Sequence, residues 1–469
     1  MVGNFVPGIV QLRTFGQTSG MLLAAGAIFL GSAALTDIIP WAPLIPLGLL
    51  AAGLGAWLVM AAAFGSPYAI MLYFAAIAFM TNAQFRVRGA GDMSGDWQSA
   101  LKFLIWLGAG VIGFPHMPPL RELLTRPACA CCLAYIVMAL ASCLYSPVPA
   151  YSFGCALALL CLFFFSFSLT TKLTESQMLW TLLVTLSVFN VGGWIVFFVY
   201  PELGTSAAWT TGGMVFRMCG LAGQATNLGA VCAKAVGAAF VLFYAHRRGS
   251  VLALILGAFG VVTLIKSDAR TTEIAAVAGI GAVIAARSIL LSAGAALGGA
   301  IALILPQLFP GLVRMVSSGF SRSGDPTELY TLTGRLEIWD FAWKQITLSP
   351  IIGYGYNSSK VVLGSHVGFE NGLMVDSAHN LYLQNMLSVG LMGTVPLIVL
   401  LAYLAWKCAT LPIPFVCYTI VLVLVSSVSD TDTIGTTPTL MTMMFFVVSV
   451  WPGLTQSDSA QRAVRMSYA

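Results

Sequence analysis

Of the four histidines in the chain, His379 has the sequence context that best suits catalysis. In residues 376–380, Ser377 is a residue type that caps helices, and we expect it to begin a helix whose second residue is His379. The positive end of a helix dipole, and any arginine nearby, disfavour the protonated imidazole. His379 is therefore expected to be neutral near pH 7, which suits a general base. The alternative is a histidine that only anchors a helix end at the membrane interface.

Polar residues follow His379 at helical spacing. Asn380, Gln384 and Ser388 recur every four residues, so they lie on one face of the expected helix. That stripe should face other helices rather than lipid, and Asn380 and Gln384 are candidates to support the histidine.

Arginines in segments far apart along the chain are candidates to bind an anion. Arg217, Arg270 and Arg335 come from three separate segments that we place on the outer side of a membrane. The guanidinium fork matches phosphate oxygens and stays charged at any relevant pH, so a lipid diphosphate is a suitable ligand. For Arg270 and Arg335 the alternative is ion pairing with nearby carboxylates, which are Asp268 or Glu273 and Glu337 or Asp340 respectively.

Arg86 and Arg88 extend this set, because with Lys102 they flank or occupy another outward segment. Short outward loops are normally poor in cations. An outward-facing site for an anionic substrate explains the exception; a miscounted span or contacts with lipid headgroups are the alternatives.

Two further features have weaker chemical meaning. Lys234 lies inside an apolar run, where a charge is expensive and indicates function by default; it could pair with Glu273 or line an aqueous groove. Asp430-Thr431-Asp432 has the spacing of a metal-binding Asp-x-Asp motif, but three residues are a weak pattern. The cysteines at 129, 131 and 132 suit helix packing better than metal binding, so we assign no metal site and no cofactor.

The composition requires these residues to be positioned by helices within a membrane. Of 469 residues, 58% are hydrophobic and 8% are charged, whereas soluble chains carry about 25% charged residues. This excludes a water-soluble enzyme and a nucleic-acid-binding protein. Continuous apolar runs of about 16 to 23 residues match the thickness of the bilayer core and lack the alternation of membrane β-strands. We therefore predict an all-α polytopic membrane protein.

The apolar runs predict a bundle of 12 to 14 transmembrane helices with one long helical loop. The candidate spans are 18–36, 41–64, 66–83, 98–114, 127–146, 149–170, 178–200, 223–245, 250–265, 271–286, 288–306, 381–403, 411–429 and 434–452. They divide the chain into N-terminal helices (1–306), a polar interval (307–380) and C-terminal helices with a tail (381–469). The distribution of Lys and Arg in short loops places both termini in the cytoplasm and the polar interval outside.

Within the polar interval, residues 334–346 predict an amphipathic helix. Leu336, Trp339, Trp343 and Ile346 recur at helical spacing after a cap at Gly334, and we expect both tryptophans to face the membrane. Residues 350–357 contain Pro350, Gly353 and Gly355 and are typical of turns.

Three stretches of the chain resemble the O-antigen ligase/polymerase family of bacterial membrane proteins. They are Thr333-Gly334-Arg335 with Trp339, Pro350, Gly353 and Gly355; His379-Asn380 followed nine residues later by Gly390 and then by Gly393; and Arg217 ahead of Gly220, Gln224 and Asn227, with Arg270 in residues 266–270. The resemblance covers roughly residues 210–400.

The resemblance implies a glycosyltransferase of the bacterial inner membrane with a periplasmic active site. Its donor would be a glycan on undecaprenyl diphosphate, and for an O-antigen ligase the acceptor would be lipid A–core of lipopolysaccharide. Membrane lipids would be the other partners, and no metal or cofactor is implied. By resemblance, His379 would be the catalytic histidine, Arg217 and Arg270 would bind the diphosphate, and Arg335 would join them. The pattern around His379 favours the ligase over a polymerase or a ligase acting on protein serine. A transporter or flippase for lipid-linked sugars is the alternative of another class.

Overall fold

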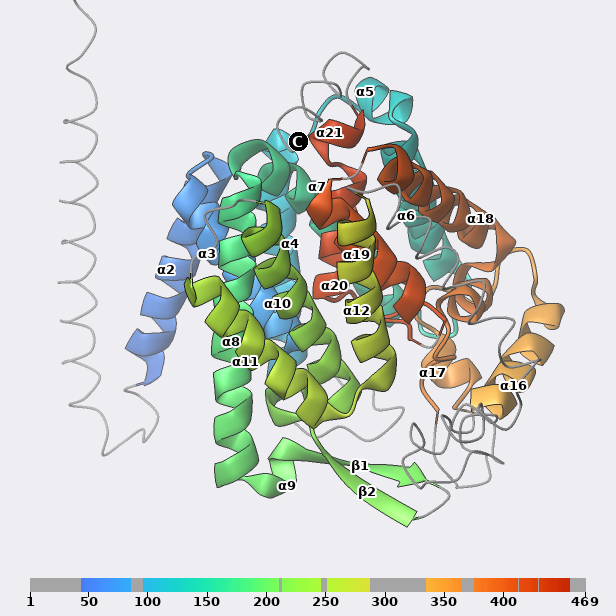
Figure 1. Ribbon diagram of the computed structural model, residues 1–469. Helices are drawn as coiled ribbons and strands as arrows, with labels where there is room; N and C mark the ends of the chain where they lie inside the picture. The colour runs from blue at the N-terminus through green and yellow to red at the C-terminus, as the bar shows by residue number, and fades with distance from the viewer. Residues whose placement is uncertain are drawn as a thin grey trace, which may run out of the picture. The chain divides into compact units, whose positions relative to one another are not determined.

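The computed structural model describes residues 44–85, 96–210, 213–245, 251–286, 335–364, 375–411, 413–428 and 430–455 (Figure 1). The predicted spans 18–36 and 288–306 lie outside these residues, as do Arg86 and Arg88. Contacts divide the chain into a unit of residues 1–64 and a unit of residues 65–469. Every site discussed below belongs to the second unit.

Almost all of the described elements are helices, as the composition predicts. The α-helices are α2 (Leu44–Ala63), α3 (Pro67–Asn82), α4 (Trp97–Gly113), α5 (Leu120–Thr125), α6 (Pro127–Ala141), α7 (Pro149–Lys172), α8 (Glu175–Val199), α9 (Pro201–Gly204), α10 (Ala225–Ala245), α11 (Val251–Ser267), α12 (Arg270–Ala285), α16 (Arg335–Leu348), α17 (Ser359–Val362), α18 (Leu381–Thr410), α19 (Pro414–Ser426), α20 (Leu440–Ser449) and α21 (Pro452–Thr455). Short 3₁₀ turns lie at η1 (Phe114–His116), η2 (Ser142–Leu144) and η3 (Gly220–Ala222).

Local sequence explains where several helices begin. Proline occupies the first turn of α3, α6, α7 and α19, where its missing N–H costs no helical hydrogen bond. Asp96 caps α4, and Thr174 with Gln177 forms a capping box at α8. These residues end the connecting loops and fix the start of each span.

Six described helices are long and apolar enough to cross a membrane. They are Trp97–His116, Pro127–Leu144, Pro149–Lys172, Glu175–Val199, Ala225–Tyr244 and Leu381–Thr410. Shorter apolar helices add Ala52–Ala63, Pro67–Asn82, Val251–Ser267, Pro414–Ser426 and Leu440–Ser449. The all-α polytopic fold class is confirmed; the full count of 12 to 14 spans stays a prediction.

The predicted spans 411–429 and 434–452 are shorter helices than expected. α19 has 13 residues and α20 has 10, which at 1.5 Å per residue is about 20 Å and about 15 Å. Neither matches a ~30 Å hydrocarbon core. All ten residues of α20 are buried, so protein surrounds this short helix. Between the two helices, residues 427–428 and 430–439 lie in a polar loop that replaces the expected helical ends; we call it the 427–439 loop, and its residue 429 lies outside the described residues.

A two-stranded hairpin was not predicted from the sequence. β1 (Thr205–Thr210) pairs antiparallel with β2 (Gly213–Met218), with Ser206 opposite Arg217. The signal for it was the pair Gly212-Gly213 between two short runs of strand-forming residues. In Figure 1 the hairpin and α16 lie at the same end of the helices.

Candidate active site

His379 lies on a tight turn immediately before α18. Its backbone is left-handed, with φ of +46°, which is uncommon for a residue with a side chain. Asn380 is the cap of α18, because its side chain accepts hydrogen bonds from the N–H groups of Tyr382 (3.0 Å) and Leu383 (3.1 Å). The expectation that Ser377 caps a helix containing His379 is therefore wrong: the helix begins after the histidine, and the strained turn presents it ahead of the helix end.

Hydrogen bonds on both sides fix the peptide that precedes His379. The Ala378 N–H donates to Gln384 Oε1 (2.9 Å), and Trp339 Nε1 donates to the Ala378 carbonyl (2.9 Å). The amide of Gln384 is fully buried and also donates to Ser359 Oγ (2.8 Å) and to the Gly435 carbonyl (3.1 Å). Because these bonds join α16, α17, α18 and the 427–439 loop, the turn is held by four elements.

α16 covers this turn as an amphipathic helix, but its orientation differs from the prediction. Ala342 and Ile346 are buried, while Trp343 is 56% exposed. Trp339 turns toward the histidine loop instead of the membrane. Sequence spacing identified the helix, but it could not show that one indole N–H has a carbonyl partner 39 residues away.

Arg335 begins α16 and acts electrostatically on His379. Burial and the Arg335 guanidinium lower the pKa of His379 to about 4, and the Asp376 carboxylate opposes them. The imidazole is thus neutral near pH 7, as the sequence predicts. Burial, which the sequence argument did not include, is the larger cause, and the arginine that it allowed for is the second.

The glycines downstream of His379 mark a break inside α18. Gly390 has φ of +60° and ψ of −164°, so the helix is interrupted there. Residues 350–355 enter the break. The N–H groups of Tyr354 and Gly355 donate to the Leu387 and Ser388 carbonyls (2.8 Å each). On the other side of the break, the N–H groups of Leu391 and Met392 donate to the carbonyls of Pro350 (2.9 Å) and Ile351 (3.1 Å).

This insertion satisfies backbone groups that a helix break leaves without helical partners. The turns predicted for residues 350–357 are confirmed, with positive φ at Gly353, Gly355 and Asn357. A Cβ on Gly390 would lie 2.3 Å from the Ile351 oxygen. The first nine residues of α18 are therefore a separate half-helix that carries the histidine turn.

Arg217 and Arg270 each bind a residue of the turn between α11 and α12. Arg217 projects from β2, is 8% exposed, and donates from Nε to the Ser267 carbonyl (3.1 Å). Arg270 begins α12 and pairs through Nε with Asp268 Oδ1 (3.1 Å). The ion pair that we considered for Arg270 is therefore present. Neighbouring residues of one turn, Ser267 and Asp268, thus bind the side chains of both arginines.

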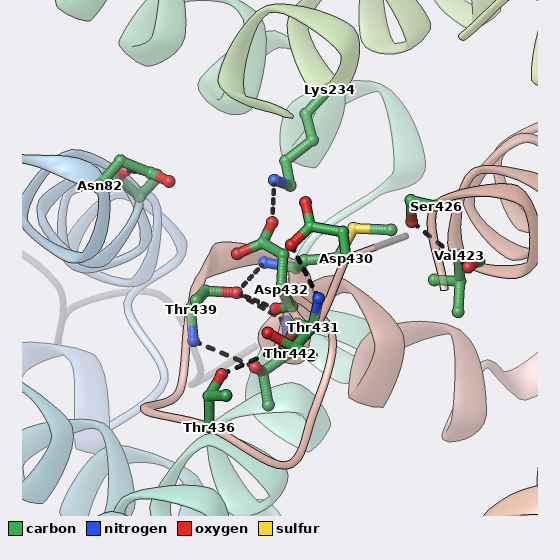
Figure 2. A network of polar contacts seen from close by, with 12 residues as sticks. Asn82, Lys234, Val423, Ser426, Asp430, Thr431, Asp432, Thr436, Thr439 and Thr442 are labelled. Atoms are coloured by element: carbon green, nitrogen blue, oxygen red, sulfur yellow. Dashed lines mark hydrogen bonds and ion pairs between the residues drawn. The ribbon is translucent and has the colours of Figure 1, made fainter. Parts of the chain in front are cut away.

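Lys234 has a partner that was not expected. It is 1% exposed on α10, and its Nζ lies 2.8 Å from Asp432 Oδ2 in the 427–439 loop (Figure 2). From the sequence we had considered Glu273 or an aqueous groove as the surroundings of this ammonium group; the structure gives it Asp432 instead. The partner lies 198 residues away in the sequence, so only the fold reveals the pair.

Comparison with known proteins finds a family match over part of the chain. Residues 233–398 match the family model of O-antigen ligase. The matched stretch contains Lys234, Arg270, Arg335 and His379, whereas Arg217 precedes it. A search of curated proteins found no match. The resemblance to the O-antigen ligase/polymerase family is confirmed.

Proposed function

With an O-antigen ligase domain at residues 233–398 as the premise, we propose that the protein is an O-antigen ligase of the bacterial inner membrane. It would transfer O-antigen glycan from undecaprenyl diphosphate to a sugar hydroxyl of lipid A–core, on the periplasmic side. The acceptor oxygen attacks the anomeric carbon from the face opposite the diphosphate, so the configuration inverts. The bond from the anomeric carbon to the phosphate oxygen breaks, and undecaprenyl diphosphate leaves with the electron pair.

The observation that carries the proposal is the neutral imidazole of His379 on a fixed turn beside Arg335. A neutral imidazole takes up or orients a proton of the acceptor hydroxyl, which a protonated one cannot accept. A guanidinium beside it stabilises the charge that develops on the leaving diphosphate. Both requirements of the reaction are thereby met at one place.

Arg217 and Arg270 suit the binding of the donor diphosphate. Their turn presents two guanidinium groups from different elements, and a guanidinium forms bidentate hydrogen bonds to phosphate oxygens. Asp268, which holds Arg270 in place, would be displaced or shared when the diphosphate binds.

The test is transfer by purified protein in lipid nanodiscs, with defined undecaprenyl-diphosphate glycan and lipid A–core, with and without a chelator. We expect His379→Ala and Arg335→Ala each to reduce kcat by about 100-fold or more. Arg126→Ala is the matched control, since Arg126 pairs with Glu122 on the loop side of α6. Normal transfer by purified His379→Ala would remove this residue from the mechanism, and loss of activity with chelator would contradict a metal-independent reaction.

The acceptor distinguishes the related functions. A deletion strain that keeps polymerised glycan on undecaprenyl diphosphate but has none on core indicates a ligase, whereas cores capped with single repeats indicate a polymerase. Formation of glycosidic bonds by purified protein without a gradient rules against a flippase.

A further inference from the structure

Two parallel helices, α8 and α11, lead to the turn between α11 and α12. Trp194 Nε1 on α8 donates to Thr263 Oγ1 on α11 (2.9 Å). Three residues further along both helices, the ammonium group of Lys266 lies over the ring of Phe197, 5.9 Å from its centre. The contacts advance equally on both helices, so α8 and α11 run side by side in the same direction. In Figure 1 both end on the side of the helices where β1 and β2 lie.

The outward side of this helix pair is an exposed apolar surface. Its side chains recur every three or four residues along each helix, and each is 49–69% exposed. They are Val188, Val191, Ile195 and Phe198 on α8, and Val262 and Ile265 on α11. Since α8 is long and apolar enough to cross a membrane, these side chains suit contact with lipid chains. We call these six residues the α8–α11 surface.

Three cations belong to, or bind, the short turn at which this surface ends. Lys266 follows the surface directly and is exposed in the last turn of α11. The carbonyl of the next residue, Ser267, accepts a hydrogen bond from Arg217 Nε (3.1 Å). Asp268 then pairs with Arg270 (3.1 Å). The ion pairs of the described residues do not include Lys266, so an exposed ammonium group stands between the apolar surface and the two residues that bind arginines.

A lysine over an aromatic ring at a helix end is not by itself a binding site, because such residues also anchor helices at the membrane interface. Lys407 in the last turn of α18 is an example. Its Nζ lies 5.7 Å from the ring centre of Tyr403 and 5.0 Å from that of Trp406. Lys266 differs because the two residues that follow it each bind an arginine. That arrangement indicates an anionic ligand rather than an anchor alone.

We propose that the polyprenyl chain of the donor lies along the α8–α11 surface, and that Lys266 binds the donor diphosphate together with Arg217 and Arg270. This rests on the proposed glycan transfer and adds to it a third cation and the path of the lipid. In a polyprenyl diphosphate the first isoprene unit is bonded directly to a phosphate oxygen. Its binding site must therefore change from apolar to cationic over a very short distance, as happens between Ile265 and Lys266.

The head of the lipid, not its chain, supplies the affinity. Lipid tails are as apolar as the side chains of the α8–α11 surface, so moving the chain from the bilayer to this surface gains little. The bond to the diphosphate places the chain there instead. At the head, Lys266 exchanges a cation–π contact with Phe197 for a charged hydrogen bond to phosphate, which is the stronger interaction at an exposed site. Its flexible side chain makes this exchange by a change of rotamer.

The first experiment measures the Kd of radiolabelled undecaprenyl diphosphate for the full-length protein in phosphatidylcholine nanodiscs. We expect Lys266→Met to raise the Kd by about 10-fold, through the loss of one charged hydrogen bond, and Lys266→Arg to keep most of the affinity. Lys407→Met is the matched control and should bind like wild type. An unchanged Kd in Lys266→Met overturns the role of the lysine. Equal displacement of the ligand by phosphatidylglycerol overturns it too, because the site would then bind any anionic headgroup.

The second experiment locates the chain with a polyprenyl diphosphate that carries a diazirine on its second isoprene unit. We expect photolabelling of residues 194–198 on α8 and 262–265 on α11. Labelling of the exposed apolar residues within 391–399 on α18 instead overturns the path of the chain. In the transfer assay, Lys266→Met should raise KM for the donor with little change in kcat. Wild type that binds the diphosphate through Lys266 but transfers no glycan overturns the proposed function and leaves this site intact.

Discussion

Replacing Gly390 with alanine tests whether the break in α18 positions the catalytic turn. At φ of +60° and ψ of −164°, Gly390 has a backbone conformation that is essentially restricted to glycine. The added Cβ would lie 2.3 Å from the Ile351 oxygen and 2.5 Å from the Ile352 nitrogen. Both are backbone atoms, so no side-chain rotation can relieve the contact.

The expected cost has two parts. A residue forced into such a conformation costs about 1–3 kcal/mol. If residues 350–355 move out of the break to relieve the clash, they lose up to four backbone hydrogen bonds, each with a net contribution of about 0.5–1.5 kcal/mol. Partial movement gives an expected destabilisation of roughly 2–5 kcal/mol. The half-helix before the break would shift as well, and with it His379.

The assay is thermal unfolding in detergent together with glycan transfer. Gly281→Ala is the matched control, because Gly281 lies in α12 and a Cβ there meets no atom within 4 Å; alanine should leave that helix unchanged or stabilise it by up to about 1 kcal/mol. We expect Gly390→Ala to melt several degrees below the control and to transfer glycan poorly. Equal melting temperatures and equal transfer in the two variants would refute the positioning argument.

Three other predictions concern the polar groups near the site. Lys234→Met should destabilise the protein by about 3–5 kcal/mol in thermal unfolding, because it leaves a carboxylate without its buried partner; adding Asp432→Asn should recover most of the loss. Gln384→Leu should cost about 1–3 kcal/mol, because a buried N–H and a buried carbonyl lose their partner, and should lower kcat more than it raises KM. Folding lowers the pKa of His379, so the folded protein loses stability as pH falls from about 6.5 to 4. Folding raises the pKa of Asp430, so its contribution has the opposite sign, and stability is lost as pH rises from about 4 to 6. His379→Gln should therefore be more stable than wild type at pH 4.5, by at most about 3 kcal/mol, but not at pH 7, which unfolding at the two pH values measures.

The helices and the catalytic candidates were predictable because both depend on local sequence. Apolar runs of sufficient length fold as helices in lipid, and the spans at α7, α8 and α18 match their predicted ranges within a few residues at their first ends. The neutral state of His379 was also predicted. A nearby arginine was among the predicted causes, but burial, the larger cause, was not. The helix cap was also predicted wrongly, because Ser377 and Asn380 are both good caps and only the fold selects the second.

Contacts between distant segments could not be predicted from one sequence. The Lys234–Asp432 pair joins α10 to the 427–439 loop, and the Trp339 bond joins α16 to the histidine turn. Contacts between distant segments also explain why α19 and α20 are shorter than predicted. Their sequences are apolar enough for full spans, but the polar residues between them find partners on α10 and α18 and fold as a loop instead.

The spacing from His379-Asn380 to Gly390 now has a physical meaning that the sequence pattern alone did not provide. The nine residues between Asn380 and Gly390 are the half-helix of α18 before its break, which at 1.5 Å and 100° per residue is about 14 Å and two and a half turns. Asn380 caps one end of this half-helix, and residues 350–355 hold the other end by backbone hydrogen bonds. Because each added residue would rotate the turn by about 100° relative to the insertion, the spacing determines the direction in which the imidazole faces. A glycine is required at the far end because Gly390 has a positive φ and the backbone of Ile351 passes within contact of it.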